Sequence, residues 1–261
     1  MGTIISWTDE TWNPVTGCSK VSEGCRNCYA ERLSLKFGYT KLPWTAANAA
    51  ANVHQHPERL AKLKSYKAGT RVFVNSMSDL FHPQVSEAFV HEVLDTCAAR
   101  PDLIFQCLTK RPERAKAFEM PSNFWIGTSI EDSRVLYRLD QLCEVQADVH
   151  FISFEPMIGP IEPDLRGISW CIVGGESGPD HRVFDHRWAC TIRDAASDCG
   201  TAFFFKQSAA YTTERGVALD HGDGTFWIWH QMPGDLKEAQ QVPRQMDARQ
   251  WLAWTLAHKA A

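Results

Sequence analysis

The sequence lacks a hydrophobic run long enough to cross a membrane, which takes roughly 20 residues in a helix. Its first residues also lack the basic and apolar regions of a secretory signal peptide. We therefore expect a cytoplasmic protein with no membrane partner. Excess positive charge is absent too, since the formal net charge is -4. The whole molecule is not expected to attract nucleic acid, although this balance leaves room for a local basic patch.

The chain also lacks the regular cysteine pairs of a disulfide framework. Its nine cysteines, an odd number, are spread over 261 residues without an export signal, which favours reduced thiols and one metal site. Hydrophobic residues make up 44% of the sequence, enough for the core of one large domain or two modest ones.

Three of the cysteines lie together in a turn-rich loop near the amino end, W-T-D-E-T-W-N-P-V-T-G-C-S-K-V-S-E-G-C-R-N-C-Y. Cys25 and Cys28 form a Cys-x2-Cys step, in which two sulfurs can face one metal, and Cys18 can supply a third ligand. Polar residues separate the three, so no apolar periodicity would bury them as packing groups. The loop therefore predicts a metal site.

The cysteine spacing favours iron over zinc. Structural zinc sites usually have four protein ligands in two separated pairs, and the sequence has no second Cys-x2-Cys. Three cysteines suit a four-iron cluster with one iron open to a small molecule, as in the radical S-adenosylmethionine (SAM) enzymes. Zinc with His54 or His56 as the fourth ligand is the alternative.

Short apolar segments alternate with helical patterns along the middle of the chain. Strands are predicted at residues 11–15, 71–75, 103–108, 124–127, 149–154, 170–173 and 202–205, and helices at 29–37, 86–99, 112–118, 133–145 and 187–199. This alternation is typical of an α/β fold with a parallel sheet. We expect a partial or full TIM-like β/α barrel over residues 1–208, with a doubly wound open sheet as the alternative.

Two segments fall outside this alternation. Residues 39–69 contain prolines and small residues and are interpreted as a lid-like insertion with a short helix at 58–67. Residues 209–261 are expected to form a C-terminal extension, with an edge strand at 224–229 and an amphipathic helix at 247–258. The extension is interpreted as a cap on the barrel or an interaction surface.

Polar residues follow almost every predicted strand. They are Asn75 to Asp79, Thr109 to Arg111, Thr128 to Asp132, Glu155, Gly174 to Gly178 and Lys206 to Ser208. In a β/α barrel these positions converge on one mouth, and the cysteine loop should lie at the same rim. Some of these residues, such as Ser129 and Asp132, are also suited to cap helices. Capping does not require Lys110, Glu155, Glu176 or Lys206, which we expect to line a site.

Five motifs taken together resemble a known family. They are the cysteine loop extended to Arg32, F-V-N-S-M-S-D-L-F-H, L-T-K-R-P-E-R, F-E-P-M-I-G-P and V-G-G-E-S-G-P. The combination is similar to the "Gp-thirty-seven/Gp-sixty-eight" phage protein family, a radical-SAM-like group of bacteriophage and bacterial proteins. The resemblance covers residues 3 to about 208 and implies a partial β/α barrel with an iron-sulfur cluster at its mouth.

The sequence departs from the wider radical SAM pattern in two respects. The usual cysteine motif is Cys-x3-Cys-x2-Cys with an aromatic before the third thiol, whereas here the first gap is six residues and Asn27 takes the aromatic position. The usual Gly-Gly-Glu follows the second strand, whereas here it follows the sixth. Either residues after the second strand bind the cofactor's amine, or the cofactor is bound differently. The candidate cofactor-binding residues are Ser76, Ser78, Asp79, Ser129, Glu131, Gly174, Gly175 and Glu176.

The first hypothesis is a radical SAM enzyme with a 4Fe-4S cluster on Cys18, Cys25 and Cys28. Lys110, Glu155 and Lys206 are its candidate catalytic residues, and Lys110 and Arg111 are placed to bind an anionic substrate, such as a nucleotide or nucleic acid. Such an enzyme needs a reductase or flavodoxin-type electron donor. The alternative is an iron-sulfur or zinc binding protein in which the metal is structural or transfers electrons without radical chemistry.

The remaining cysteines and one histidine are given no role in this chemistry. Cys97, Cys107, Cys143, Cys171, Cys190 and Cys199 lie in apolar helices or strands and are expected to be buried packing groups. His82 follows Phe81 and precedes Pro83, and it is expected to be a surface or capping residue, with a position facing the mouth as the alternative.

Overall fold

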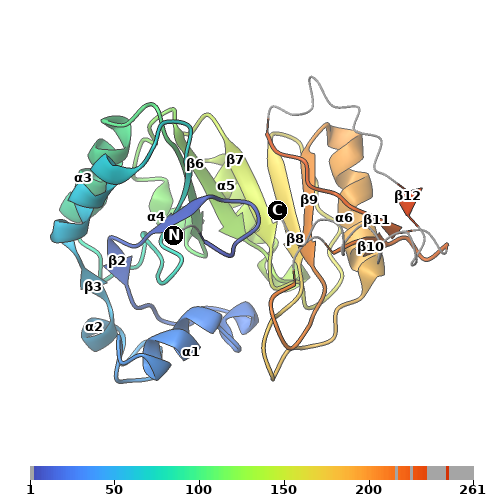
Figure 1. Ribbon diagram of the computed structural model, residues 1–261, viewed down its shortest axis with the longest axis horizontal. Helices are drawn as coiled ribbons and strands as arrows, with labels where there is room; N and C mark the ends of the chain where they lie inside the picture. The colour runs from blue at the N-terminus through green and yellow to red at the C-terminus, as the bar shows by residue number, and fades with distance from the viewer. Residues whose placement is uncertain (1–2, 215–216, 224–225, 234–244, 247–261) are drawn as a thin grey trace. The chain divides into compact units, whose positions relative to one another are not determined.

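The computed structural model describes residues 3–214, 217–223, 226–233 and 245–246. The chain forms two compact units (Figure 1). The first consists of Met1–Ile130 and Tyr137–Phe151, and the second of Glu131–Leu136 and Ile152–Ala261. Over the described ranges, none of the helices has both the length and the hydropathy needed to traverse a bilayer.

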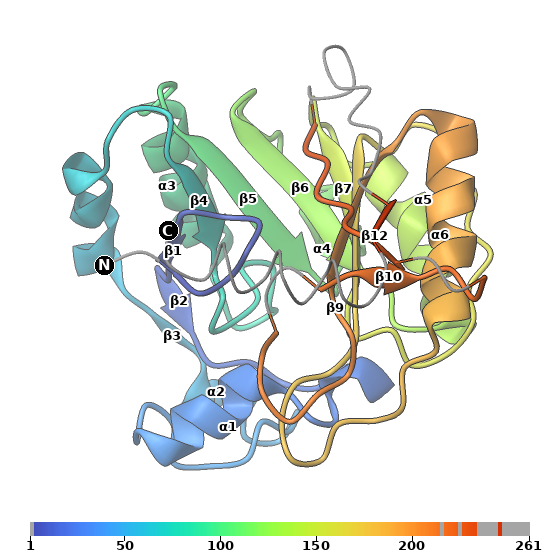
Figure 2. The ribbon, with the colours of Figure 1, turned by 45° about the vertical axis from the view of Figure 1, so that its right-hand side comes forward.

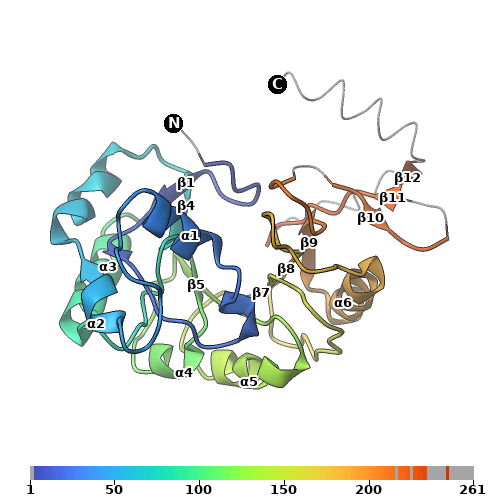
Figure 3. The same ribbon diagram turned by 90° about the horizontal axis from the view of Figure 1, so that it is seen from below.

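The first unit is built on parallel strands covered by helices. The strands are β1 (Glu10–Trp12), β4 (Arg71–Val74), β5 (Ile104–Thr109) and β6 (Phe124–Ser129), and the helices that pack beside them are α3 (Glu87–Ala98), α4 (Pro112–Ala115) and α5 (Tyr137–Cys143). Figure 3 shows the three helices on the outer side of the strands. Phe105, Cys107 and Phe124 are fully buried, as expected for strands that are covered on both faces.

The second unit contains the last strands of the same sheet. They are β7 (His150–Phe154), which begins in the first unit, β8 (Trp170–Gly174) and β9 (Ala202–Gln207), with α6 (His186–Cys199) packed against β8 and β9. Helix α6 begins after Asp185, whose side chain accepts from the amide of Arg187, and ends at Gly200 in the left-handed conformation (φ 68°). These two caps explain why the sequence specifies this helix at both ends.

The strand order identifies the fold class. The seven strands of the sheet are ordered β1-β4-β5-β6-β7-β8-β9, which follows their order along the chain. A doubly wound sheet reverses its strand order at a switch point, and this sheet does not. The predicted partial β/α barrel is therefore confirmed, with seven parallel strands.

Several predicted elements differ in detail. The insertion at 39–69 contains α2 (Ala49–Asn52), β3 (His54–Gln55) and a 3₁₀ helix, η2 (Pro57–Ser65), and β3 pairs antiparallel with β2 (Val15–Thr16). The helix predicted at 58–67 is thus 3₁₀, with i to i+3 bonds such as Arg59 N to His56 O. The helix predicted at 133–145 is divided into a 3₁₀ turn, η3 (Ser133–Val135), and α5.

Part of the predicted extension belongs to the second unit. The amide of Phe205 donates to Trp229 O at 2.8 Å, and Trp170 Nε1 donates to Gln231 O at 2.9 Å. The edge strand predicted at 224–229 is present as β11 (Phe226–Trp227), which pairs antiparallel with β10 (Leu219–Asp220) and β12 (Gln245–Met246). The helix predicted at 247–258 lies outside the described residues.

Candidate functional site

The cysteine loop is attached to the segment that follows strand β4. Gly17 forms a parallel bridge with Ser78, and its amide donates to the carbonyl oxygen of Met77 at 3.1 Å. The amide of Val15 donates to Asn75 Oδ1 at 3.3 Å. Figure 2 shows helix α1 (Tyr29–Lys36), which follows the loop, beyond the carboxyl ends of β4 and β5. The loop and the residues after β4 therefore lie at one edge of the sheet.

Ser76 and Ser78, two of the predicted cofactor-binding residues, hold this loop in place. Ser78 Oγ donates to Val15 O at 2.8 Å, and Ser76 Oγ donates to Asn13 Oδ1 at 3.2 Å. The carbonyl oxygen of Ser76 accepts from the Tyr29 hydroxyl at 2.8 Å. Both serines thus connect the first strand region to the loop after β4.

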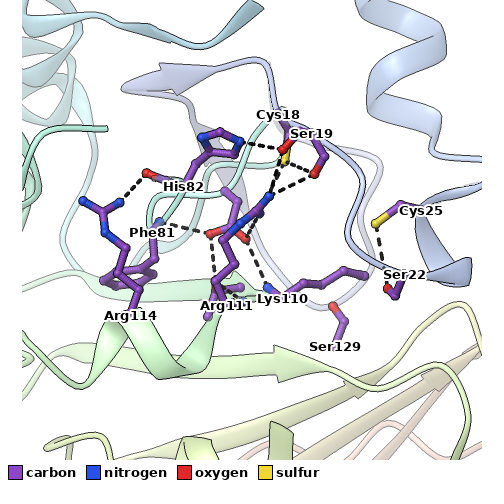
Figure 4. A network of polar contacts seen from close by, with 12 residues as sticks. Cys18, Ser19, Ser22, Cys25, Phe81, His82, Lys110, Arg111, Arg114 and Ser129 are labelled. Atoms are coloured by element: carbon purple, nitrogen blue, oxygen red, sulfur yellow. Dashed lines mark hydrogen bonds and ion pairs between the residues drawn. The ribbon is translucent and has the colours of Figure 1, made fainter. Parts of the chain in front are cut away.

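Asp79 is buried and accepts four hydrogen bonds. Figure 4 shows the network of polar contacts around Arg111 and the cysteine loop to which these bonds belong. Its Oδ1 accepts from the amide of Phe81 at 3.0 Å and from Thr109 Oγ1 at 2.8 Å. Its Oδ2 accepts from the amide of Lys110 at 3.1 Å and from Arg111 Nη1 at 2.9 Å. Four donors occupy the two oxygens, so the carboxylate is committed to the protein's own groups.

Arg111 connects this carboxylate to the first cysteine. Its Nη1, besides contacting Asp79, donates to Cys18 Sγ at 3.7 Å. Its Nη2 donates to the carbonyl oxygen of Ser19 at 3.0 Å and to Ser19 Oγ at 3.2 Å. The guanidinium therefore fixes the backbone next to Cys18 and places positive charge beside its sulfur, a geometry that a planar group with five donors can satisfy.

His82 completes the network, and the expectation that it is a surface or capping residue is wrong. The side chain is 2% exposed, because the turn that follows Asp79 directs it inward. Its Nδ1 accepts from the amide of Gln84 at 3.1 Å, so Nε2 carries the proton and donates to Ser19 Oγ at 2.8 Å. Burial, reinforced by Arg111, lowers the pKa of His82 to about 4, so the ring is neutral near pH 7. The alternative, that His82 faces the mouth, agrees with this position beside the cysteine loop.

The thiol of Cys18 is strongly affected by these surroundings. Burial, followed by the negative charge of Asp79, raises its pKa to about 12, although Arg111 acts in the opposite direction. The free thiol is therefore protonated near pH 7. Binding to a metal would displace this proton, since a coordinating thiol is deprotonated by the cation.

Cys28 lies at the amino end of helix α1. Burial raises its pKa, while the amides of Glu31 and Ala30 and the charge of Lys110 lower it. Charge on Cys25 raises the pKa of both Cys28 and Cys18. The three thiols therefore share one electrostatic environment with Asp79, Lys110 and Arg111.

The three cysteines of the loop are the candidate ligands of a metal group. Within the described residues, no group of three or more His, Cys, Asp or Glu side chains converges on a point where one ion would be held. The iron-sulfur cluster and the zinc ion therefore both stay predictions. Lys110 and Arg111 would balance the negative charge of a thiolate-bound cluster.

The two histidines considered as zinc ligands are engaged elsewhere or exposed. His56 Nε2 is 2.8 Å from Thr16 Oγ1, and its Nδ1 is 3.2 Å from Glu58. His54 is exposed in β3. Neither forms a metal group with the cysteines in this part of the chain.

The second unit contains the other two candidate catalytic residues. Glu155 follows β7 and Lys206 lies near the end of β9, and the Lys206 ammonium donates to Glu155 Oε1 at 2.7 Å. Ser153 Oγ donates to Glu155 Oε2 at 3.0 Å. Both charged groups are largely shielded, with side-chain exposures of 20% for the lysine and 13% for the glutamate. The structure thus brings these two predicted residues into one ion pair.

Glu176 is paired with an arginine that the sequence did not suggest. Arg182 donates to it from its backbone amide at 2.8 Å, from Nε at 3.1 Å and from Nη2 at 2.5 Å. The glutamate is 7% exposed, so the arginine neutralises an otherwise buried charge. The spacing of six residues has no periodicity that would have revealed this pair.

Gly174 and Gly175 are explained by close approach of the chain to itself. A Cβ on Gly174 would lie 2.9 Å from Glu155 Oε1, and a Cβ on Gly175 would lie 2.6 Å from the amide nitrogen of Ala209. These glycines therefore make room for the Glu155 side chain and the segment after β9. Ligand binding by either glycine stays a prediction.

Ser129 and Glu131 belong to different units of the chain. Ser129 closes β6 in the first unit and is 6% exposed, with its carbonyl oxygen accepting from Arg138 Nη1 at 2.9 Å. Glu131 belongs to the second unit and is 1% exposed, and its carbonyl oxygen accepts from the amide of Ile158 at 2.9 Å. A shared cofactor-binding role for these residues stays a prediction.

The expectation of six buried packing cysteines is confirmed for Cys97, Cys107 and Cys171. It is wrong for Cys143 and Cys199, which are exposed because each is the last residue of its helix, α5 and α6. Cys190 is partly buried.

The fold and the site define a parallel β/α protein with a cysteine-rich loop at the carboxyl edge of the sheet. The chain belongs to the family described as Protein of unknown function (DUF5131), which matches residues 2–254. Among solved structures, a mutant of spore photoproduct lyase is similar to this chain at a TM-score of 0.48 and 11% sequence identity, covering 79% of this chain and 77% of that chain. No curated protein matches.

Proposed function

We propose that this protein is an iron-sulfur enzyme of the radical SAM type, with a 4Fe-4S cluster held by Cys18, Cys25 and Cys28. The observation that carries the proposal is the position of the cysteine loop at the carboxyl edge of the sheet, where Arg111 Nη1 donates both to Cys18 Sγ and to Asp79. When bound, such a cluster supplies an electron that cleaves SAM to methionine and a 5'-deoxyadenosyl radical. We also propose that the protein is related to the "Gp-thirty-seven/Gp-sixty-eight" phage protein family and that it acts in the cytoplasm.

Arg111 and the first amides of α1 would stabilise the thiolates, and Lys110 would bind the substrate. Arg111 donates to Cys18 Sγ, and the first amides of α1 act on Cys28, so both thiolates gain stabilising contacts. Arg111 is fully engaged by Asp79, Ser19 and Cys18, which assigns it to the cluster environment. Lys110 is the better candidate for an anionic substrate group, such as a phosphate of a nucleotide or nucleic acid. Electrons would come from a reductase or flavodoxin-type partner.

One observation favours the second candidate function, an iron-sulfur protein without radical chemistry. Ser76, Ser78 and Asp79, the residues expected to hold the amine of SAM, all make hydrogen bonds within the protein. SAM would then need other ligands, or the cluster would be structural or transfer electrons. Binding of SAM separates the two functions.

Metal analysis tests the cluster. Anaerobically reconstituted protein is expected to be brown and to contain about four irons and four sulfides, the composition of a 4Fe-4S cluster. Replacing the three loop cysteines by serine should abolish the iron, because the thiolates are removed. Replacing the exposed Cys143 and Cys199 by serine is the matched control and should leave it unchanged. Iron retained by the triple variant, or stoichiometric zinc, would contradict the proposal.

SAM chemistry needs a second measurement on the loaded protein. Calorimetry should detect SAM binding, and dithionite should then yield 5'-deoxyadenosine. If the cluster-loaded protein neither binds SAM nor forms 5'-deoxyadenosine, the result would support the second candidate function, an iron-sulfur protein without radical chemistry.

Glu155→Gln is expected to lower the free energy of unfolding by about 1–3 kcal/mol while leaving iron content unchanged. The substitution removes the charge paired with the largely shielded ammonium of Lys206, which then lacks its acceptor. Glu162→Gln, at an exposed position of the same unit, is the matched control. A loss no larger than that of the control would show that the pair does not stabilise the second unit.

A further inference from the structure

Helix α1 and the turn after it expose an unusual number of large side chains. The helix buries only Ala30, Glu31 and Ser34. Beyond them, Phe37 is 59% exposed and Tyr39 is 63% exposed. Adjacent exposed aromatic residues of this kind mark interaction sites more often than isolated ones do.

The two exposed rings lie close together, and the ammonium group of Lys36 lies beside one of them. The ring centroids of Phe37 and Tyr39 are 6.0 Å apart, with planes inclined by 40°. Lys36 Nζ lies 5.6 Å from the centroid of Phe37, a cation-π distance. An ammonium group is therefore held beside an open aromatic surface.

The charge of this segment is opposite in sign to that of the whole chain. Residues 26–42 contain four basic residues, Arg26, Arg32, Lys36 and Lys41, all of them exposed. The one acidic residue in the segment, Glu31, is 8% exposed and pairs with Lys20 at 2.7 Å. The outward face is thus positive, although the chain's formal charge is -4. Such a local field selects an anionic partner.

We propose that this basic aromatic patch, formed by Arg32, Lys36, Phe37, Tyr39 and Lys41, binds single-stranded nucleic acid. Unpaired bases would stack on Phe37 and Tyr39, while the cationic groups contact phosphates. A duplex fits less well, because its bases are already stacked on one another. The binding itself does not depend on the cluster. The further inference that this nucleic acid is the substrate of the enzyme rests on the proposed function. It follows from the position of the patch, since α1 begins directly after Cys28.

Fluorescence anisotropy of a labelled oligothymidine of about 15 nucleotides tests the patch, with the full-length protein in its metal-free form. The wild type is expected to bind, with log K falling against log salt at a slope of about -2 if three phosphates are contacted. Phe37→Ala with Tyr39→Ala should weaken binding by at least about tenfold, since each stacked base contributes strongly. Lys36→Glu with Lys41→Glu should weaken binding and flatten the salt dependence.

Tyr211→Ala with Lys64→Glu is the matched control, because both residues are exposed and lie outside the patch. This variant should bind within about twofold of wild type, and circular dichroism checks that every variant is folded. Undetectable binding at low salt, equal binding by the patch variants, or a preference for duplex DNA or anionic vesicles would overturn the proposal. Iron content is measured separately, so loss of the cluster with retained oligonucleotide binding would count against the proposed function alone.

Discussion

Asp79→Asn is expected to lower the free energy of unfolding by about 3–5 kcal/mol, because it leaves the buried guanidinium of Arg111 without its counter-charge. The new amide also places N–H groups where Asp79 accepts from Phe81, Thr109, Lys110 and Arg111. The measurement is urea unfolding of the metal-free protein. Iron content after reconstitution should fall as well, because Arg111 fixes the backbone beside Cys18.

An exposed ion pair supplies the control for this prediction. Asp164 and Arg166 are paired, with side-chain exposures of 53% and 83%. Asp164→Asn should therefore leave the free energy of unfolding nearly unchanged. Combining Asp79→Asn with Arg111→Met should recover part of the loss, since the unpaired charge is then removed. Equal losses at Asp79 and Asp164 would show that the buried pair does not support the first unit.

Gly17→Ala is expected to prevent metal binding by displacing the cysteine loop. Gly17 has a φ of 81°, and an added Cβ would lie 1.8 Å from the carbonyl oxygen of Asn52 at the end of α2. The neighbour is backbone, so the loop or α2 has to move. Reconstituted iron should fall to background, and the unfolding free energy should fall by more than the 1–2 kcal/mol of a left-handed conformation alone.

Gly167→Ala separates the steric clash from the backbone conformation. Gly167 has the same φ of 81°, but no atom lies within 4 Å of an added Cβ. It should therefore lose about 1 kcal/mol and retain full iron binding. If the two variants lose equal stability and both bind iron, the contact between Gly17 and Asn52 does not position the loop.

The fold could be predicted because its determinants are local. The apolar segments around Phe73, Phe105 and Phe203 are short and continuous, and helices such as α3 follow a capping serine, Ser86, so strands and helices fall close to their predicted bounds. In the insertion a short helix was predicted at 58–67, but the sequence did not distinguish the i to i+3 bonds of η2 from the bonds of an α-helix.

The site could be predicted in composition but not in its pairings. Position after a strand was enough to place Asp79, Lys110 and Arg111 beside the cysteine loop. Which acceptors are already occupied depends on contacts between distant parts of the chain, such as Arg111 with Ser19. Arg182 on Glu176 was missed for a related reason, since only the path of the intervening loop brings them together.

Helix α1 sets the spacing between the two proposed features of the first unit. Its eight residues span about 12 Å, with Cys28 preceding the first turn and Phe37 following the last. A nucleic acid whose bases stack on Phe37 and Tyr39 would therefore reach the cysteines with other nucleotides, further along its chain. The length of α1 would thus fix the distance between the base that is bound and the base that reacts.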